Sequence, residues 1–483
     1  MKKFLLSILI VLYSISSIWS AEIDSTLFNK SFEEISSIGL PVVMIETENG
    51  VFPTFDIAEK SDPDIMWGKG ITNAEKVPGK ITLYKGGNLL YDSGEYVEGE
   101  SGMTIKVRGN VSAIDHEKKP YKLKLQKKAD LLFRGGQDAD YTDKNWLLIK
   151  DNNINANIGF KINELMEMQW TPSYCYVNVM FNGRYNGVYM LCESVRRNQD
   201  CRLNVSKTGY VFEWDTYWWN SHKYVESLIF QKGSPLKYTF KYPDEDDITD
   251  DQLDYIENAI AKAEASLNDG TYPDYIDVES FASWILAHDI LGTWDAAGSN
   301  YFLTKYDNTE NSKIMMANLW DLETNFRRVN QWSTAHLAGW FFYESFFNNE
   351  NETFLRSYKD KWMKVSPTIF DETIDCIHQF EDSSEGKDLE RSIILDNQLW
   401  GTSWKTVKEA CSDAIDWFAD RKVWMSEQMD KIHLKTHISE TNFHNDDIIS
   451  SSDIYSLQGV KLNKEYSRPG IYVKNKKKFL ISN

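Results

Sequence analysis

The sequence is poor in the residues that build compact metal or disulfide scaffolds. Its 483 residues include only five cysteines and eight histidines, and no two cysteines form a Cys-x-x-Cys pattern. The motifs Gly-x-Ser-x-Gly and His-Glu-x-x-His and the phosphate-binding Walker loop are also missing. These absences exclude a zinc finger, a disulfide-stapled module and the common serine hydrolases, zinc proteases and P-loop enzymes.

Positive charge is also scarce. The 53 basic residues stand against 72 acidic ones, which gives a formal net charge of -19. Such a charge repels phosphate backbones, so nucleic acid is not expected as a partner, whereas a basic protein or peptide substrate suits it. The hydrophobic content of 42% is that of an ordinary globular protein with one large domain or two to three smaller ones.

Long apolar runs are confined to the N-terminus. Residues 1–20 begin with two lysines after Met1, continue with an apolar run and leave it through a Ser-rich stretch that ends at the small residue Ser20, which predicts a secretory signal peptide cleaved after Ser20. No later segment has the roughly 18 uninterrupted apolar residues that a membrane helix needs. The sequence therefore predicts an exported protein that is secreted or held at the cell surface, without a transmembrane segment.

The order of the periodic segments predicts an α+β fold. Alternating strands are expected from residue 40 to about 132, and helical spacing is expected in "NWLLIKDNNINANIGFKINELMEM". Further helices are expected after Thr249, over 277–295 and over most of 354–432, with two short strands in "SNYFLTKYD" and "KIMMANLWD". A linker over 433–453 separates a β-rich tail over 454–483.

The segment 174–193 is typical of a β-hairpin. If Gly183 and Arg184 form its two-residue turn, Cys175 falls opposite Cys192. The two cysteines are then either bonded or remain as two buried thiols, and the sequence leaves this open.

Cationic side chains are expected on one face of the N-terminal strands. In "PYKLKLQK", Lys122 and Lys124 alternate with apolar residues, and Arg108 follows a neighbouring strand. These three could grip phosphate oxygens, or they could line a solvated sheet face. Glu193 ends the hairpin, where it could pair with a sheet lysine or a nucleotide sugar, or serve as an ordinary loop acid.

Acidic and amide side chains follow the apolar segments in the second half of the chain. Asp295 follows an apolar helix, where an acid opposes the helix dipole, and is either a chemical group or a turn former. Asp321 and Glu323 flank Leu322, so both would project to the same side if the strand continues. With Asn300 they could hold a divalent metal, or they could face water.

Eight ordered blocks carry a family resemblance. They are "IKVRGNVS", "KKPYKLKLQKKADLL", "KNWLLIKD", "YVNVMFNGRYNGVYMLCESVRR", "GYVFEWD", "KYPDEDDITDDQLDYI", "LGTWDAAGSNYFL" and "NLWDLETNF". In this order they resemble the CotH (spore coat protein H) kinase family over about residues 40 to 430. The resemblance implies an atypical protein-kinase-like fold with a β-rich N-terminal lobe and a helical C-terminal lobe, and phosphate transfer from ATP to serine with Mg²⁺ or Mn²⁺.

The resemblance also implies roles for individual residues. Asp321 matches the metal-binding aspartate, with Glu323 as its supporting acid, and Asp295 matches the second essential aspartate, with Asn300 in the same block. Lys122 or Lys124 matches the lysine of the nucleotide lobe, and Glu193 falls in the block before the hinge. The implied domains are a β-rich region over 21–100 and the kinase-like domain over 101–432.

Three segments depart from the family pattern. They are "NVSAIDHE", the positions around Asn157 and Ile158, and Arg327, which stands where a glycine is common. The tail from Ile454 to Ile481 separately resembles the short C-terminal domains that route proteins through type IX secretion, which would make export machinery a partner.

Three functions follow from these patterns. The first is an exported serine protein kinase whose substrate is rich in Lys and Ser. The second is a catalytically inactive kinase-like surface module that binds protein or glycan. The third is a polysaccharide hydrolase, because the acid pair of such an enzyme is a spatial feature.

Overall fold

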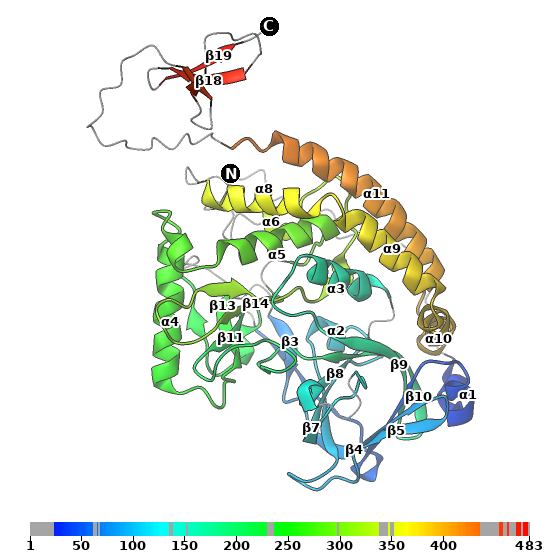
Figure 1. Ribbon diagram of the computed structural model, residues 1–483. Coiled ribbons are helices and arrows are strands. Elements are labelled where there is room, and N and C mark those ends of the chain that lie inside the picture. The colour runs from blue at the N-terminus through cyan, green and yellow to red at the C-terminus, as the bar shows by residue number, and fades with distance from the viewer. Residues whose placement is uncertain are drawn as a thin grey trace. The chain divides into compact units, whose positions relative to one another are not determined.

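The computed structural model describes most of the chain. The described residues are 24–60, 65, 68–134, 139–150, 153–228, 236–296, 299–337, 346–347 and 352–434, with short strands between 454 and 481. The predicted signal peptide lies outside them. The chain divides into two compact units, Met1–Leu434 and Lys435–Asn483 (Figure 1).

The first unit begins with an eight-stranded sheet that closes on itself. The strand order is β1-β9-β10-β8-β7-β6-β4-β5, and β1 pairs with β4 as well as with β9. The strands are β1 (Val42–Thr47), β4 (Val77–Lys85), β5 (Asn88–Asp92), β6 (Met103–Val107), β7 (Tyr121–Ala129), β8 (Asp143–Ile149), β9 (Tyr174–Phe181) and β10 (Arg184–Glu193). Strands β1, β4 and β5, from the region predicted as 21–100, thus share one sheet with β6 to β10.

The interior of the closed sheet is filled by alternate residues of its strands. Ile105, Leu123 and Trp146 pair across β6, β7 and β8 and belong to one buried apolar cluster. The opposite face of the same strands contributes residues such as Leu147 to a second, larger cluster that extends into the helices. A separate two-stranded sheet of β2 (Asp56–Glu59) and β3 (Lys69–Thr72) lies beside α2 (Val111–Ile114).

The helical spacing expected from Asn145 onwards is wrong for its first part. Residues Asp143–Ile149 form β8, and the helix α3 covers only Asn155–Leu165. The cause is burial on both sides, since Trp146 and Leu147 enter different apolar clusters and so leave no period-two signal. The part of the prediction that rests on Ile158 and Ile162 is confirmed, as both are buried in α3.

The hairpin of β9 and β10 is present, but its register differs from the prediction. Its turn is Asn182 and Gly183, and a bulge follows between Tyr185 and Gly187, so Cys175 pairs with Leu191. Both cysteines are free. The interpretation as two thiols is therefore correct. The register error comes from the turn, which lies one residue earlier than predicted and moves the pairing by two positions, of which the bulge restores one.

A second, five-stranded sheet lies among the helices in the order β12-β13-β11-β14-β15. Its strands are β11 (Tyr210–Asp215), β12 (Val225–Glu226), β13 (Lys237–Tyr242), β14 (Tyr301–Lys305) and β15 (Ile314–Met316). The two strands expected around Tyr301 and Ile314 are confirmed as an antiparallel pair.

Seven helices accompany this second sheet in the described residues after 249. They are α4 (Asp250–Ala265), α5 (Val278–Leu291), α6 (Thr334–Leu337), α8 (Thr353–Val365), α9 (Ile369–Asp382), α10 (Ser384–Trp400) and α11 (Val407–Lys431). Thr249 caps α4 in a capping box with Gln252, as predicted. The apolar helix α5 is buried along most of its length and packs on α8, while α9 and α11 lie side by side (Figure 1).

Mixed α and β structure therefore confirms the α+β class. At the N-terminal end, α1 (Phe32–Ser36) begins with a capping box at Ser31. Among the described residues, no helix combines the length and the hydropathy needed to span a membrane.

The second unit contains the antiparallel strands β16 (Ile454–Ser456), β17 (Lys461–Leu462), β18 (Gly470–Lys474) and β19 (Lys477–Ile481). Its role in secretion stays a prediction.

Candidate functional site

Three cations extend from the strands β6 and β7 of the closed sheet. Lys122 on β7 pairs directly with Lys106 on β6, and Arg108 follows two residues later on the same side as Lys106. Like charges placed opposite each other destabilise a sheet, and neither lysine has an ion-pair partner among the described residues. The pair therefore costs stability unless an anion lies against it.

Lys122 is the most perturbed of these cations. Burial is the largest cause that lowers its pKa to about 8, and the charges of Lys106, Arg196, Lys241 and Arg108 lower it further. Lys124, two residues along β7, is exposed and pairs with Thr104. The structure thus separates the two predicted lysines and places Lys122 at the centre of the positive charge.

The second sheet adds a cation and two acids next to this centre. Lys241 lies 2.9 Å from Glu213 Oε2, and although burial alone would lower its pKa, Glu213 and Asp215 raise it above the ordinary value. Burial, then the charge of Glu213, raises the pKa of Asp215 to about 6. Glu213 also accepts a hydrogen bond from the backbone N–H of Asn300 at 3.1 Å, which links this cluster to β14.

Asp295 is positioned by the end of α5. The helix stops at Gly292, which takes the left-handed conformation with φ of 58°. The following chain then bonds to the segment after β15, because Trp294 N donates to Thr324 O at 3.2 Å and Asp295 N donates to Thr324 Oγ1 at 2.9 Å. These bonds bring Asp295 beside the other predicted acids.

Asp321 and Asn300 both have left-handed backbones. Their φ values are 53° and 61°, a region in which Asp and Asn occur more often than most other residues. The Asn300 side-chain amide donates to Asp321 Oδ2 at 3.1 Å. The expectation that a continuing strand would align Asp321 with Glu323 is wrong, because β15 ends at Met316 and Asp321 begins the 3₁₀ turn Leu322–Thr324.

The acids nevertheless share one electrostatic environment. Asp321 keeps exposed surface, yet the protein around it desolvates the carboxylate, and this burial with the charges of Glu323 and Asp295 raises its pKa to about 6. The pKa of Asp295 is also raised, first by burial and then by Glu323. Arg108 acts in the opposite direction and lowers the pKa of Asp321, so the cation that follows β6 lies near the acids.

Helix α3 braces the turn that carries Asp321. At one end of the turn, Leu319 N donates to Asn163 Oδ1 at 2.7 Å, and at the other Asn155 Nδ2 donates to Glu323 O at 3.0 Å. Between them Gly159 lies so close to Leu322 that an added Cβ would be 2.3 Å from a side-chain carbon. The position of Asp321 therefore depends on the small residue at 159.

A buried polar network fixes α5 behind Asp295. Burial alone would raise the pKa of Asp289, but His336, Tyr358 and Ser333 hold it below its usual value. His336 Nδ1 lies 2.8 Å from Asp289 Oδ2, and Tyr358 OH donates to the same oxygen at 2.6 Å. Arg421 on α11 donates to backbone carbonyls that include those of Asp289 and Gln331. Helices α5 and α11 and the segment after Asp321 are thus joined.

The chemistry of the acidic cluster suits a divalent cation. Asp321, crowded by Asp295 and Glu323, has negative charge that a cation would neutralise, and the amide of Asn300 offers an oxygen of the kind Mg²⁺ accepts. Among the described residues, no three His, Cys, Asp or Glu side chains lie close enough to enclose a metal by themselves. The arrangement fits an ion held by one or two protein groups together with substrate phosphates.

Glu193 lies apart from the other predicted site residues. It pairs with Trp146 across the sheet, so its side chain is on the interior face, opposite to Lys122. It is fully buried, lies 2.9 Å from Arg134 and 3.6 Å from Arg202, and accepts from Ser173 N at 3.0 Å. Its partners are thus arginines and not a sheet lysine, and no nucleotide sugar could reach it directly.

Several residues near the site were not predicted from the sequence. Lys106 carried a usable signal, because it alternates with Arg108 in the same way that Lys122 alternates with Lys124. Glu213 in the strand "YVFEWD" was a charged residue in an otherwise apolar run. Lys241 and Arg196 carried no local signal, since only the tertiary fold brings them to Lys122. Arg327, one of the departures from the family pattern, is exposed.

These observations define a class of protein in which a cationic strand face meets an acidic, metal-compatible cluster. A family model described as CotH kinase protein matches residues 105–374, more than half of the chain. The chain therefore belongs to the CotH kinase family, as the resemblance predicted. No curated protein matches the chain.

Proposed function

We propose that the protein is an atypical kinase that transfers a phosphoryl group from ATP to a serine of a protein substrate. The observation that carries this proposal is that Arg108, on the same side of the sheet as the lysine pair Lys106 and Lys122, lies close enough to Asp321 to lower its pKa. A polyphosphate between the two would neutralise the unpaired cations on one side. The closed sheet would then serve as the nucleotide lobe, and the helices with the second sheet as the other lobe.

The residues have distinct parts in the proposed reaction. Lys122, Lys106 and Arg108 bind and orient the phosphates, and Asp321 with Asn300 would hold Mg²⁺ or Mn²⁺, which neutralises charge on the phosphates when bound. Asp295 accepts the hydroxyl proton of the serine at a carboxylate oxygen. The serine Oγ forms a bond to the γ-phosphorus as the bond to the β-phosphate oxygen breaks, and ADP leaves.

The raised pKa of Asp295 supports its proposed role as the group that accepts the serine proton. A base works best when its pKa approaches the working pH, and burial with the neighbouring Glu323 moves Asp295 in that direction. The export of the enzyme, through the N-terminal segment and the C-terminal unit, belongs to the same proposal. A Lys- and Ser-rich substrate suits the net charge of -19.

A labelled-ATP assay tests the proposal. The purified protein is incubated with γ-labelled ATP, Mg²⁺ or Mn²⁺ and serine peptides of basic and acidic composition, and label on the peptide is measured. Metal-dependent transfer that is lost in Asp321→Asn supports the kinase. Metal-dependent ATP binding without transfer supports the alternative of an inactive kinase-like binding module, and absence of ATP binding by folded protein contradicts both.

A further inference from the structure

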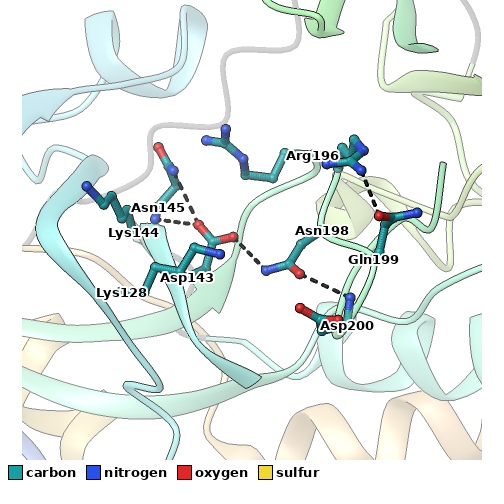
Figure 2. Close-up of a pocket in the computed structure, with 9 residues that line it drawn as sticks. Lys128, Asp143, Lys144, Asn145, Arg196, Asn198, Gln199 and Asp200 are labelled. Atoms are coloured by element: carbon teal, nitrogen blue, oxygen red, sulfur yellow. Dashed lines mark hydrogen bonds between the residues drawn. The ribbon is translucent and has the colours of Figure 1, made fainter. Parts of the chain in front are cut away.

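A polar pocket lies at the rim of the closed sheet, beside the segment 196–200 that follows β10. It measures about 290 Å³ and is lined by Lys128, Asp143, Lys144, Asn145, Arg196, Arg197, Asn198, Gln199 and Asp200. Figure 2 shows the residues of β7 and β8 on one side and those of the segment 196–200 on the other. None of these lining residues is aromatic or aliphatic, so the pocket offers no apolar wall to a base, and a small hydrophilic ligand fits better.

Two of the charged side chains in the pocket already have partners within the protein. Arg197 donates to Val205 O and to Gln199 Oε1, both at 2.8 Å. Asp143 lies 3.6 Å from Arg202 and accepts from Asn198 Nδ2 at 3.0 Å. Arg197 therefore has fewer N–H groups free for a ligand, although it keeps its charge, and the charge of Asp143 is already shared with Arg202.

Three cations remain without a partner. Among the described residues, Lys128, Lys144 and Arg196 have no hydrogen-bond or ion-pair partner, and the one carboxylate left to oppose them in the pocket is that of Asp200. Lys144 and Arg196 are half-buried, so solvent screens them less than it would screen exposed side chains. A chain with a net charge of -19 thus concentrates a positive excess in one cavity.

We propose that this pocket binds a phosphoryl group, held by Lys128, Lys144 and Arg196. The positive excess of the pocket matches the charge of a phosphate near neutral pH. Arg196 also acts on Lys122, so the pocket adjoins the proposed nucleotide site without sharing its acids. The inference rests on the proposed function. It names a substrate class, which is proteins in which a residue near the target serine already carries phosphate. Free phosphate is the other source of the same chemistry.

Peptide binding tests the pocket directly. A fluorescent serine-rich peptide with one phosphoserine and its unphosphorylated form are titrated against the full chain by anisotropy, and inorganic phosphate is titrated by calorimetry. The test variant is Lys128→Ala with Lys144→Ala. The matched control is Lys127→Ala with Lys207→Ala, which removes the same charge from two exposed lysines that do not line the pocket. Circular dichroism and thermal unfolding establish that each variant is folded.

The expected result is at least tenfold tighter binding of the phosphoserine peptide, lost in the test variant and retained within about twofold in the control. Binding of inorganic phosphate but not of the peptide, with the same loss in the test variant, assigns the pocket to free phosphate. Equal binding in wild type and test variant overturns the proposal. ATP binding is measured in parallel, because phosphopeptide binding by a chain that fails to bind ATP would sink the proposed kinase and leave the pocket standing.

Discussion

The two faces of the closed sheet carry charges in opposite conditions, with Glu193 on β10 and Lys122 on β7. On the interior face, Glu193 is fully buried and held by Arg134, Arg202 and a backbone N–H. On the other face, Lys122 is surrounded by further cations and has no acid to pair with among the described residues. A buried charge with partners is accounted for by the structure around it, whereas an unpaired cluster of one sign marks a candidate ligand site. The predictions below separate these two conditions.

The largest effect is expected on stability, when the ion pairs of Glu193 on the interior face are removed. Glu193→Ala removes the buried acid that Arg134 and Arg202 share and leaves each arginine with one acid, Asp130 or Asp143. We expect a loss of about 3 kcal/mol in the free energy of unfolding. Denaturant unfolding followed by circular dichroism measures this loss. Glu98→Ala, at an exposed position, is the matched control. A Glu193 variant as stable as the control would show that the interior ion pairs contribute little.

Breaking the acidic side of the ligand site should abolish activity and leave the fold intact. Asp321→Asn keeps the shape of the side chain and removes its charge, so we expect phosphoryl transfer to fall by about 100-fold or more. The γ-labelled ATP assay measures this fall, with Asp420→Asn on the exposed surface of α11 as the control. Retention of activity in Asp321→Asn would remove this residue from the proposed reaction.

The two lysines of β7 should differ in their effect on nucleotide binding. Lys122→Met removes the charge at the centre of the cationic cluster, and we expect about tenfold weaker binding of the ATP and Mg²⁺ complex, a change of about 1.4 kcal/mol. Lys124→Met, on the exposed part of the strand, should change the affinity less than about twofold. Calorimetry in the presence of Mg²⁺ gives both values, and the reverse order would mean that the register places the phosphates further along β7.

The left-handed backbone at Asn300 allows its amide and its conformation to be tested separately. Asn300→Gly removes the amide but tolerates φ of 61°, whereas Asn300→Ala removes the amide and adds about 1 kcal/mol of backbone strain. We expect both variants to lose metal-dependent ATP binding by several-fold, and only the alanine variant to unfold more easily. Equal thermal stability of the two would show that the strain is relieved by a local rearrangement.

The smallest effect concerns pH. A lysine is charged below its pKa, so Lys122, with a pKa of about 8, loses its charge as the pH rises through 8. ATP favours the charged form, so its affinity should fall a few-fold between pH 7.5 and 9, and binding near pH 8 should take up a proton. Calorimetry in buffers of different ionisation enthalpy measures the proton. Lys122→Arg keeps its charge and should remove the pH dependence, whereas an unchanged pH dependence would assign it to another group.

Much of this architecture follows from local patterns in the sequence. Period-two alternation identified β7 and its lysines, the capping residue Thr249 marked the start of α4, and the apolar content of α5 indicated its burial. The acids Asp295 and Asp321 could be selected because each follows an apolar element. Those signals depend on neighbours in the sequence, so they can be recognised without knowledge of the fold.

The remaining features depend on contacts between distant segments. The side-by-side placement of Asp321 and Glu323 was wrong because the strand ends early and Asp321 turns into the left-handed region. The role of Glu193 could not be predicted, since its partners Arg134 and Arg202 come from other parts of the chain. Lys241 and Arg196 reach Lys122 only through the second sheet and the segment after β10.

The closure of the N-terminal sheet also sets an order for folding. Strand β1 can pair with β4 early, but its other edge must wait for β9, since Val42 lies against Asn178, 136 residues later in the chain. Pairing over such a separation is slow, and until it occurs the open edges can meet the edges of other chains. A chain that ends before residue 174 can contain Lys106, Arg108 and Lys122, the cations proposed to bind the nucleotide, and still lack the strands that complete the sheet.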